Sequence, residues 1–330
     1  MQFECNAFAA KLKAACEAKN AQFYIVYHIN PDGDCIGSAF GLSLILRKLG
    51  AKCAVIGRDG VPAHFHWMTD PIKNDILDEN AQYIGVDCKD RGRTGSVLMQ
   101  QPYAFWIDHH GSPEEQAEYE YVRPECSACS ELVLSVAEAL GIEPDRQTAE
   151  LLYTALVTDT SCFRTSATNA QSFASAARLA ACGIDPYAIG RRHAMVKSAA
   201  RLKLEQIIFA GMELHCDGQL AVGTIMLDDL KTAGIAEVNG PETENINGLL
   251  EVIETARVTV MIREYPADNP EGQTRFSVKT TEAGLSARSV AEQFGGGGHP
   301  NAAGGFMRET PARARELLTA ACKKLLENEK

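Results

Sequence analysis

The sequence has no apolar run long enough to cross a bilayer. Its first residues, Met-Gln-Phe-Glu-Cys-Asn, also lack the basic stretch and apolar core of a secretory signal. We therefore expect a cytoplasmic protein with no membrane partner.

Positive charge is scarce as well. Lysine and arginine total 32 against 43 aspartate and glutamate residues, which gives a formal net charge of −11. A protein that grips long nucleic acid must neutralise many phosphates, so this balance argues against a long duplex as partner. Short or small phosphorylated substrates remain open, because carboxylates gathered around divalent cations are neutralised by them.

The cysteines form no repeating framework. Eleven are scattered along the chain, and an odd count without an export signal favours reduced thiols. Cys126 and Cys129 have the spacing of half a zinc ribbon, but the sequence has no second pair at a suitable distance. We interpret this pair as packing thiols.

There is also no internal repeat or low-complexity segment, and 330 residues suit two domains, each with its own core. In the first half, short apolar runs alternate with amphipathic segments, which is typical of a parallel α/β sheet flanked by helices. We expect strands at 23–27, 52–56, 83–86 and 104–107, and helices at 35–49, 130–139, 145–157 and 169–181.

Residues 183–186 (Gly-Ile-Asp-Pro) predict the end of the preceding helix, and residues 187–211 have the pattern of a long helix. Strands are expected at 215–227, 256–263 and 275–279, followed by a Gly-rich turn and an amphipathic helix. The expected organisation is a catalytic domain at 1–188, a linker helix at 189–212 and a smaller α/β domain at 213–330.

Acidic and histidine residues gather at four places where an apolar element has just ended. In an open α/β sheet, the loops at the carboxyl ends of the strands meet in one crevice, so distant residues can become neighbours there. The four clusters are His28, Asp32 and Asp34, then Asp87, then Asp108, His109 and His110, and finally Asp159.

Each cluster alone has a simpler interpretation. Residues 31–34 (Pro-Asp-Gly-Asp) could be a turn with exposed acids, and Asp87 or Asp159 could be a cap or a surface acid. Asp159, however, ends an apolar helix, where the negative pole disfavours a carboxylate unless a cation lies nearby. The joint occurrence of all four clusters favours a metal site.

Mixed carboxylate and imidazole ligands suit Mn²⁺ better than Ca²⁺ or Mg²⁺, while Zn²⁺, Co²⁺ and Fe²⁺ stay open. The ligands suffice for two ions, and such a pair can promote an in-line displacement at phosphorus.

A Gly-rich segment, residues 295–298, precedes His299. Consecutive glycines let backbone N–H groups approach an anion, and His299 can donate to a phosphate oxygen. The segment is not a P-loop, because no Lys-Ser/Thr follows it. The alternative is a flexible linker.

These motifs, in order and spacing, resemble those of the DHH phosphoesterases, and the segment 294–304 looks like the substrate-binding motif of their DHHA1 domain. The resemblance covers nearly the whole chain, and its length is similar to the branch of bifunctional oligoribonucleases and PAP phosphatases.

The resemblance implies roles for individual residues. His28 and Asp32 would hold one metal ion, Asp34, His109 and Asp159 the other, and Asp87 would bridge them. Asp108 would orient the neighbouring imidazoles, and His110 would contact the scissile phosphate. The residues expected to bind substrate are Arg263, Lys279, Gly296, Gly297, Gly298 and His299.

Two positions are less settled. Relatives usually carry Arg-Ser where this chain has Lys279-Thr280, and lysine offers a point charge without arginine's bidentate fork. Arg164 could reach a phosphate or could simply cap the preceding helix.

We therefore expect a manganese-dependent phosphodiesterase, or exoribonuclease, that hydrolyses short oligoribonucleotides or linear dinucleotides to mononucleotides. It would also remove the 3′-phosphate of adenosine 3′,5′-bisphosphate (PAP). A metal site on one domain and an anion site on the other would fix two ends of a short substrate. The sequence is also compatible with a homodimer.

Four alternatives follow from the same motifs. The chain could act on pApA in a cyclic-dinucleotide pathway, or it could be a nucleotide-binding regulator that has lost catalysis. A family II pyrophosphatase would need a basic Ser-Arg-Lys-Lys run, which is absent, and a long-strand exonuclease of the RecJ kind is disfavoured by the acidic composition.

Overall fold

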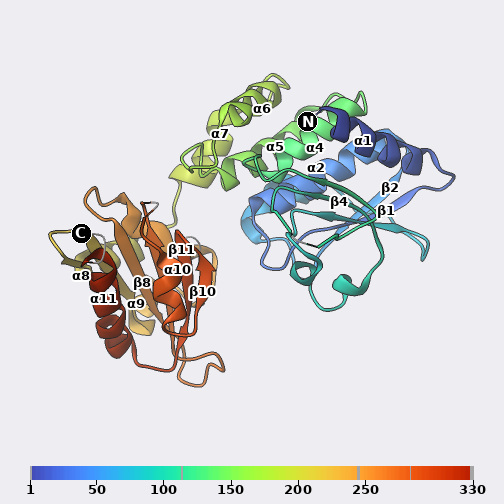
Figure 1. Cartoon of the computed structure of the whole chain (residues 1–330). Coiled ribbons are helices and arrows are strands. Elements are labelled where there is room, and N and C mark those ends of the chain that lie inside the picture. The colour runs from blue at the N-terminus through green and yellow to red at the C-terminus, as the bar shows by residue number, and fades with distance from the viewer. Residues whose placement is uncertain (1, 113, 244–245, 283, 328–330) are drawn as a thin grey trace. The chain divides into compact units, whose positions relative to one another are not determined.

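The computed structural model describes residues 2–112, 114–243, 246–282 and 284–327. The chain divides into two compact α/β units, Met1–Val196 (unit 1) and Lys197–Lys330 (unit 2), each considered by itself (Figure 1). Across these described ranges, no helix has both the length and the apolar character needed to cross a membrane.

Unit 1 is built on a sheet of five parallel strands in the order β2-β1-β3-β4-β5. This confirms the expected parallel α/β sheet, and the four strands predicted from apolar runs are all present. The short edge strand β5 was not predicted. The strands are β1 (Gln22–Val26), β2 (Lys52–Ile56), β3 (Gln82–Val86), β4 (Tyr103–Asp108) and β5 (Tyr119–Val122).

The helices of unit 1 begin and end close to the predicted positions where a prediction was made. They are α1 (Gln2–Glu17), α2 (Gly33–Lys48), α3 (His66–Thr69), α4 (Cys129–Ala139), α5 (Arg146–Asp159), α6 (Ala170–Ala180) and α7 (Pro186–Gly190). Short 3₁₀ turns are η1 (Ala63–Phe65), η2 (Arg91–Thr94) and η3 (Leu98–Gln100).

The main core of unit 1 lies between the sheet and the helices α1, α2, α4 and α5, which cover one of its faces (Figure 1). Helix α2 is central, and Gly37 lets it approach α5 closely. A Cβ at Gly37 would lie only 2.4 Å from the carbonyl oxygen of Leu151. A smaller cluster packs separately from this core: Val26, Cys88, Tyr103 and Trp106. The close α2–α5 contact fixes the ends of both helices, which carry predicted ligands.

The segment after α7 differs from the single helix expected over 189–212. A π-helical turn, η4 (Arg191–Met195), follows α7, Val196 is extended, and α8 (Ala199–Gly211) begins anew. The reason is local, because the Ser198 hydroxyl accepts a hydrogen bond from Arg201 N at 3.0 Å and so caps a new helix. The domain limits at 188 and 213 remain predictions.

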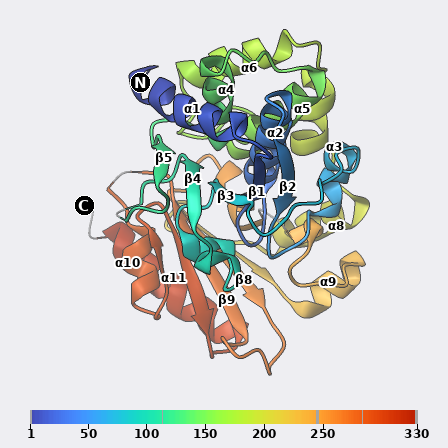
Figure 2. The ribbon, with the colours of Figure 1, turned by 90° about the vertical axis from the view of Figure 1, so that its right-hand side faces the viewer.

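Unit 2 has a six-stranded sheet in the order β10-β11-β9-β8-β7-β6, antiparallel except for the pair β7–β8. Helices α10 and α11 contribute to one apolar cluster with the sheet (Figure 2), and α8, α9 and η6 contribute to a second. The strands are β6 (Glu213–His215), β7 (Leu220–Ile225), β8 (Val258–Glu264), β9 (Thr274–Thr280), β10 (Gly297–His299) and β11 (Ala302–Met307). The helices are α8, α9 (Leu227–Ala233), α10 (Ala287–Glu292) and α11 (Pro311–Glu327), with 3₁₀ turns η5 (Pro241–Thr243) and η6 (Ile246–Val252).

Two expectations for unit 2 need correction. The strand expected over 215–227 is a hairpin, β6–β7, because Cys216, Asp217 and Gly218 adopt positive φ and turn the chain. The expected Gly-rich turn is only partly a turn: Gly295 lies in the turn after α10, whereas Gly297 and Gly298 lie in the strand β10, which pairs antiparallel with β11.

Candidate metal centre

Three strands and two helices of unit 1 deliver the predicted ligands to one edge of the sheet. The carboxyl ends of parallel strands share that edge, and the start of α2 and the end of α5 reach it too. The residues delivered are His28 after β1, Asp87 after β3, Asp108, His109 and His110 at the end of β4, Asp32 and Asp34 at the start of α2, and Asp159 at the end of α5.

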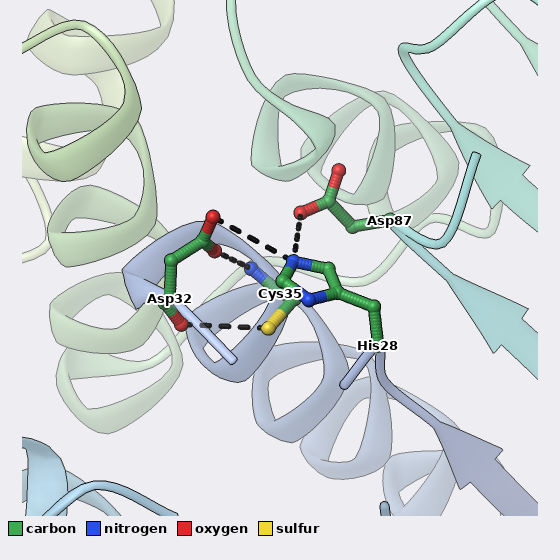
Figure 3. A group of neighbouring side chains, drawn as sticks. All are labelled: His28, Asp32, Cys35 and Asp87. Atoms are coloured by element: carbon green, nitrogen blue, oxygen red, sulfur yellow. Dashed lines mark hydrogen bonds and ion pairs between the residues drawn. The ribbon is translucent and has the colours of Figure 1, made fainter. Parts of the chain in front are cut away.

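A first group forms around His28 (Figure 3). Its Nε2 lies 3.6 Å from Asp32 Oδ2 and 3.9 Å from Asp87 Oδ2. His28 Nδ1 lies 2.9 Å from Ile29 O and 3.5 Å from a nitrogen of Arg93. A carbonyl oxygen can only accept, so Nδ1–H donates to Ile29 O, and Nε2 faces the two carboxylates.

A second group forms around His109. Its Nε2 lies 3.4 Å from Asp87 Oδ1, 3.6 Å from Asp159 Oδ2 and 3.9 Å from Asp34 Oδ2. Its Nδ1 lies 3.2 Å from Cys126 O, to which it can donate. This is the arrangement of a metal-binding imidazole, with one nitrogen oriented by a carbonyl and the other free to coordinate.

Asp34 is fixed from three directions. Backbone N–H groups of Cys129 and Ser130, at the start of α4, donate to its two carboxylate oxygens at 2.6 and 3.1 Å, and the Ser38 hydroxyl donates at 2.9 Å. Burial, together with the nearby carboxylates of Asp87 and Asp159, nevertheless raises the pKa of Asp34 well above its usual value. The hydrogen bonds therefore do not remove the repulsion within the group.

The other members of the group show the same crowding of charge. Burial raises the pKa of Asp159 to about 7. Burial lowers the pKa of His109, but the carboxylates of Asp87, Asp34 and Asp159 outweigh it and raise the pKa to about 10. Several acids packed around two imidazoles need positive charge, and a divalent cation would supply it.

Asp87 belongs to both groups. Only 2% of its surface is exposed, and its Oδ1 accepts no hydrogen bond among the described residues. Its backbone is left-handed, with φ of 58°, a conformation that is costly for a residue other than glycine. Its Oδ2 faces His28 and its Oδ1 faces His109, so one carboxylate reaches both groups, as a bridging metal ligand must.

Asp108 orients His110 and does not contact the ion-binding groups directly. One of its oxygens accepts from His110 N at 2.8 Å and lies 2.8 Å from His110 Nδ1, while the other accepts from Lys89 N at 2.5 Å. The hydrogen bond that His110 donates to Asp108 and the contact with Asp87 raise the pKa of His110 to about 10. The His110 side chain is 44% exposed, so its Nε2 can meet a substrate.

Arg263 and Lys279, in unit 2, already have partners. Arg263 is 5% exposed, and its guanidinium donates to Val238 O at 3.2 Å and Thr243 O at 3.3 Å. Lys279 Nζ donates to Glu251 Oε1 at 2.5 Å. Arg263 therefore anchors the loop at 238–243, and Lys279 would have to leave Glu251 to bind a phosphate.

The glycines before His299 have two different roles. A Cβ at Gly296 or Gly298 would lie 2.5 and 2.6 Å from the carbonyl oxygens of Gly304 and Ala302, so both glycines are required for packing. A Cβ at Gly297 would meet nothing within 4 Å. Gly297 and His299 are exposed, so this strand presents backbone and an imidazole to the solvent.

Arg164 lies in unit 1, outside both groups. It is exposed, and its Nε donates to Ser161 O at 2.8 Å, which helps to close the turn after α5. Sequence reasoning missed the supports of the site: the carbonyls of Ile29 and Cys126 and the N–H groups at the start of α4. Only Ser38, one helical turn after Asp34, had a detectable spacing.

The donor atoms fit a metal centre. One ligand atom each from Asp34, His109 and Asp159 lie within 4.8 Å of one another, and the same holds for Asp87, His109 and His110 and for a third group that contains His28, Asp32 and Asp87. The site residues were predicted from four sequence segments, and the structure brings these segments together.

Comparisons with known proteins point to the same chemistry. Residues 22–156 match the DHH family, N-terminal domain, and residues 230–328 match the DHHA1 domain. A bifunctional oligoribonuclease and PAP phosphatase NrnA of Thermus thermophilus is 26% identical over 88% of this chain and 86% of its own length.

Two further proteins are similar. A probable manganese-dependent inorganic pyrophosphatase of Clostridium acetobutylicum is 29% identical over 65% of this chain and 72% of its own length. The crystal structure of an exopolyphosphatase-related protein from Bacteroides fragilis shares the fold, with a TM-score of 0.84, 24% identity and coverage of 96% of both chains.

Proposed function

The chain belongs to the DHH family and carries a C-terminal DHHA1 domain, and from this premise we propose that it is a two-metal phosphoesterase. Its substrates would be short oligoribonucleotides or linear dinucleotides, cleaved to mononucleotides, with 3′-dephosphorylation of PAP as a second activity. The observation that carries the proposal is Asp87, whose two carboxylate oxygens face different imidazoles: Oδ2 lies 3.9 Å from His28 Nε2 and Oδ1 lies 3.4 Å from His109 Nε2.

The proposed ligand sets follow the observed groups. His28, Asp32 and Asp87 would hold one divalent cation, and Asp34, His109, Asp159 and Asp87 the other, with Mn²⁺ as the expected ion. A pair of such ions would activate water as the nucleophile and neutralise charge that develops on the phosphoryl group.

His110 would serve the substrate directly. Asp108 holds its Nδ1, so the proton on Nε2 can be donated to a phosphate oxygen or to the leaving group. Asp108 keeps this imidazolium charged and fixed in orientation, which is why a fully buried carboxylate is placed beside an exposed histidine.

Unit 2 would bind the remaining part of the substrate. We propose that the exposed backbone at Gly297 and the imidazole of His299 contact a second phosphate. Lys279 would also bind this phosphate, but only after its hydrogen bond to Glu251 has broken. This competition reduces the contribution of Lys279 to substrate affinity. Arg263 would act by holding the loop at 238–243.

The test is a comparison of rates with Mn²⁺ on a diribonucleotide, pApA and PAP. We expect nucleoside monophosphate from both dinucleotides. Rapid cleavage of PAP with no turnover of either dinucleotide would show that the oligoribonuclease assignment is wrong. Turnover of pApA alone would favour a role in a cyclic-dinucleotide pathway.

Asp87→Asn is the matching variant. Asparagine tolerates the left-handed backbone at this position better than alanine does, so loss of the charge is not confused with backbone strain. We expect kcat to fall by at least about a hundredfold, beyond the loss typical of residues that only orient ligands, together with loss of bound metal. Asp70→Asn, at an exposed position outside both groups, is the control. Unchanged turnover and metal content in Asp87→Asn would reject the two-metal site and leave a binding protein.

A further inference from the structure

Cys35 contributes a sulfur atom to the first metal group (Figure 3). It lies in the first turn of α2, directly after Asp34, and none of its surface is exposed. Its Sγ, one ring nitrogen of His28 and one carboxylate oxygen each of Asp32 and Asp87 all lie within 4.8 Å of one another. No other cysteine of the described residues belongs to such a group.

The spacing of these four atoms is close to that of a metal shell. Ligand atoms about 2.0–2.3 Å from a cation lie no more than roughly 4.6 Å apart. The group therefore needs only a small contraction to enclose an ion. The sulfur has little to hold it elsewhere, because its one hydrogen bond is a weak contact with Asp32 O at 3.5 Å.

The second group offers a contrast within the same molecule. Asp34, His109 and Asp159 contribute only nitrogen and oxygen. Sulfur ligands favour Zn²⁺ and related cations, whereas carboxylate and imidazole ligands also suit Mn²⁺. The two sites thus differ in ligand softness.

We propose that Cys35 is a metal ligand and that it makes the His28–Asp32–Asp87 site prefer a thiophilic cation such as Zn²⁺ or Co²⁺ over Mn²⁺. The other site keeps the preference of a nitrogen and oxygen shell, so the centre binds two different cations selectively. This inference rests on the two-metal site of the proposed function and names the metal preference of one half of it.

The first test uses the unmodified chain. Metal is removed with a chelator and Co²⁺ is added stepwise while the near-ultraviolet absorption is recorded. Coordination by sulfur produces an intense sulfur-to-cobalt charge-transfer band, whereas nitrogen and oxygen ligands do not. We expect this band to grow with one equivalent of Co²⁺. Binding of Co²⁺ without the band overturns the role of Cys35 even if every variant fails to fold.

Variants then locate the sulfur. Cys35→Ser should bind Co²⁺ without the band. Cys88→Ser is the matched control, since Cys88 is 1% exposed and follows Asp87 directly. Its thiol differs from that of Cys35 because it donates hydrogen bonds to the carbonyl oxygens of Val86 and Val26. Cys88→Ser should keep the band, and its loss in Cys88→Ser but not in Cys35→Ser would contradict the assignment.

Competition between cations tests the preference itself. We expect Cys35→Ser to lower the affinity of one site for Zn²⁺ at least about tenfold, or ~1.4 kcal/mol, with Mn²⁺ affinity changed much less. An equal change for both cations would overturn the proposed selectivity. If the unmodified chain binds no divalent cation at all, the proposed function fails as well, so the two failures can be told apart.

Discussion

At the scale of single residues, the turn after the helix that delivers Asp159 is strained. Ser161, Cys162 and Phe163 follow one another with φ of 47°, 59° and 62°. Left-handed backbone costs roughly 1–2 kcal/mol for each residue with a side chain. Hydrogen bonds offset part of this cost, because Cys162 N donates to Val157 O at 2.8 Å and Phe163 N to the Thr160 hydroxyl at 3.1 Å.

The strain at Ser161 predicts a stabilising substitution. Ser161 is exposed, and glycine adopts positive φ without a steric penalty. We expect Ser161→Gly to raise the free energy of unfolding of unit 1 by about 0.5–1 kcal/mol, since relief of the steric cost exceeds the added freedom of the unfolded chain. Urea unfolding measures it.

Ser166→Gly is the control for that substitution. Ser166 is also exposed, but its φ is not positive. Glycine there should therefore slightly lower the free energy of unfolding. Equal effects of the two substitutions would show that the turn at Ser161 is not strained.

At the scale of elements, two neighbouring glycines of the β10–β11 hairpin have different roles, one in packing and one in the proposed binding of substrate. Gly298 has φ of 143°, and any side chain there would collide with β11. Gly297 has ordinary backbone and open space around it. An added methyl group at Gly297 would therefore affect only what approaches the strand from outside.

Gly297→Ala should raise the KM for a dinucleotide about tenfold, or ~1.4 kcal/mol of binding, without changing thermal stability. Gly298→Ala should destabilise the hairpin, by about 1–3 kcal/mol as expected for a strained backbone. Steady-state kinetics and circular dichroism melting measure the two effects. An unchanged KM in Gly297→Ala would mean that no substrate phosphate approaches this strand.

The π-helical turn η4 places a histidine in an apolar contact. His193 stacks on Phe65, with ring centroids 5.7 Å apart, and Arg192 lies 4.7 Å above the ring of Trp67. Burial, together with the positive charges of His64 and Arg192, lowers the pKa of His193 to about 4. His193 is therefore neutral in the folded protein at pH 7.

This lowered pKa predicts acid sensitivity of unit 1. Between pH 6.5 and about 4, the unfolded chain binds a proton at His193 that the folded chain does not, so stability is lost as the pH falls through this window. From pH 7 to pH 5 the loss is at most about 2 kcal/mol. In His193→Gln, the free energy of unfolding measured in urea should depend less on pH by that amount. The same pH dependence in both proteins would show that His193 does not titrate in this window.

Much of unit 1 could be predicted because its signals are strong. Strands β1 to β4 are apolar runs, and ligands follow three of them, β1, β3 and β4. The edge strand β5 has only four residues, two of them tyrosines and one a glutamate, so no run identified it. The break before α8 depends on one serine cap, and the hairpin β6–β7 on a turn at Asp217-Gly218 whose signal is short. The partners of Arg263 and Lys279 come from distant loops, which a local pattern does not encode.

At the scale of the whole molecule, the unfolding of the two units can be followed with separate probes. The chain has two tryptophans, Trp67 and Trp106, and both lie in unit 1. The proposed metal ligands lie in unit 1 as well. Tryptophan fluorescence during unfolding therefore follows the unit that binds metal, and unit 2 needs a different probe, such as hydrogen exchange.

Removal of metal should destabilise unit 1 alone. A cation present at a hundred times its Kd stabilises the unit that binds it by about 2.7 kcal/mol. Without it, the raised pKa of Asp159, about 7, makes the folded unit hold protons that the unfolded chain releases, so stability falls as the pH rises from about 4 to 7.

Chelation should therefore lower the urea midpoint followed by tryptophan fluorescence more at pH 7.5 than at pH 5.5. Exchange rates in unit 2 should not change. Equal losses in both units, or a larger loss at pH 5.5, would contradict this assignment of the metal to the carboxylate groups of unit 1.

The wide spacing of the proposed ligands along the chain also has a consequence for biosynthesis. His28, Asp32 and Asp34 leave the ribosome well before Asp159, which lies at the end of α5 and is the last of the proposed ligands in the chain. Domains fold as units during synthesis, at about 5–20 residues per second. A nascent chain that ends before α5 carries part of a centre and lacks one proposed ligand, so uptake of both ions should wait until α5 has been translated.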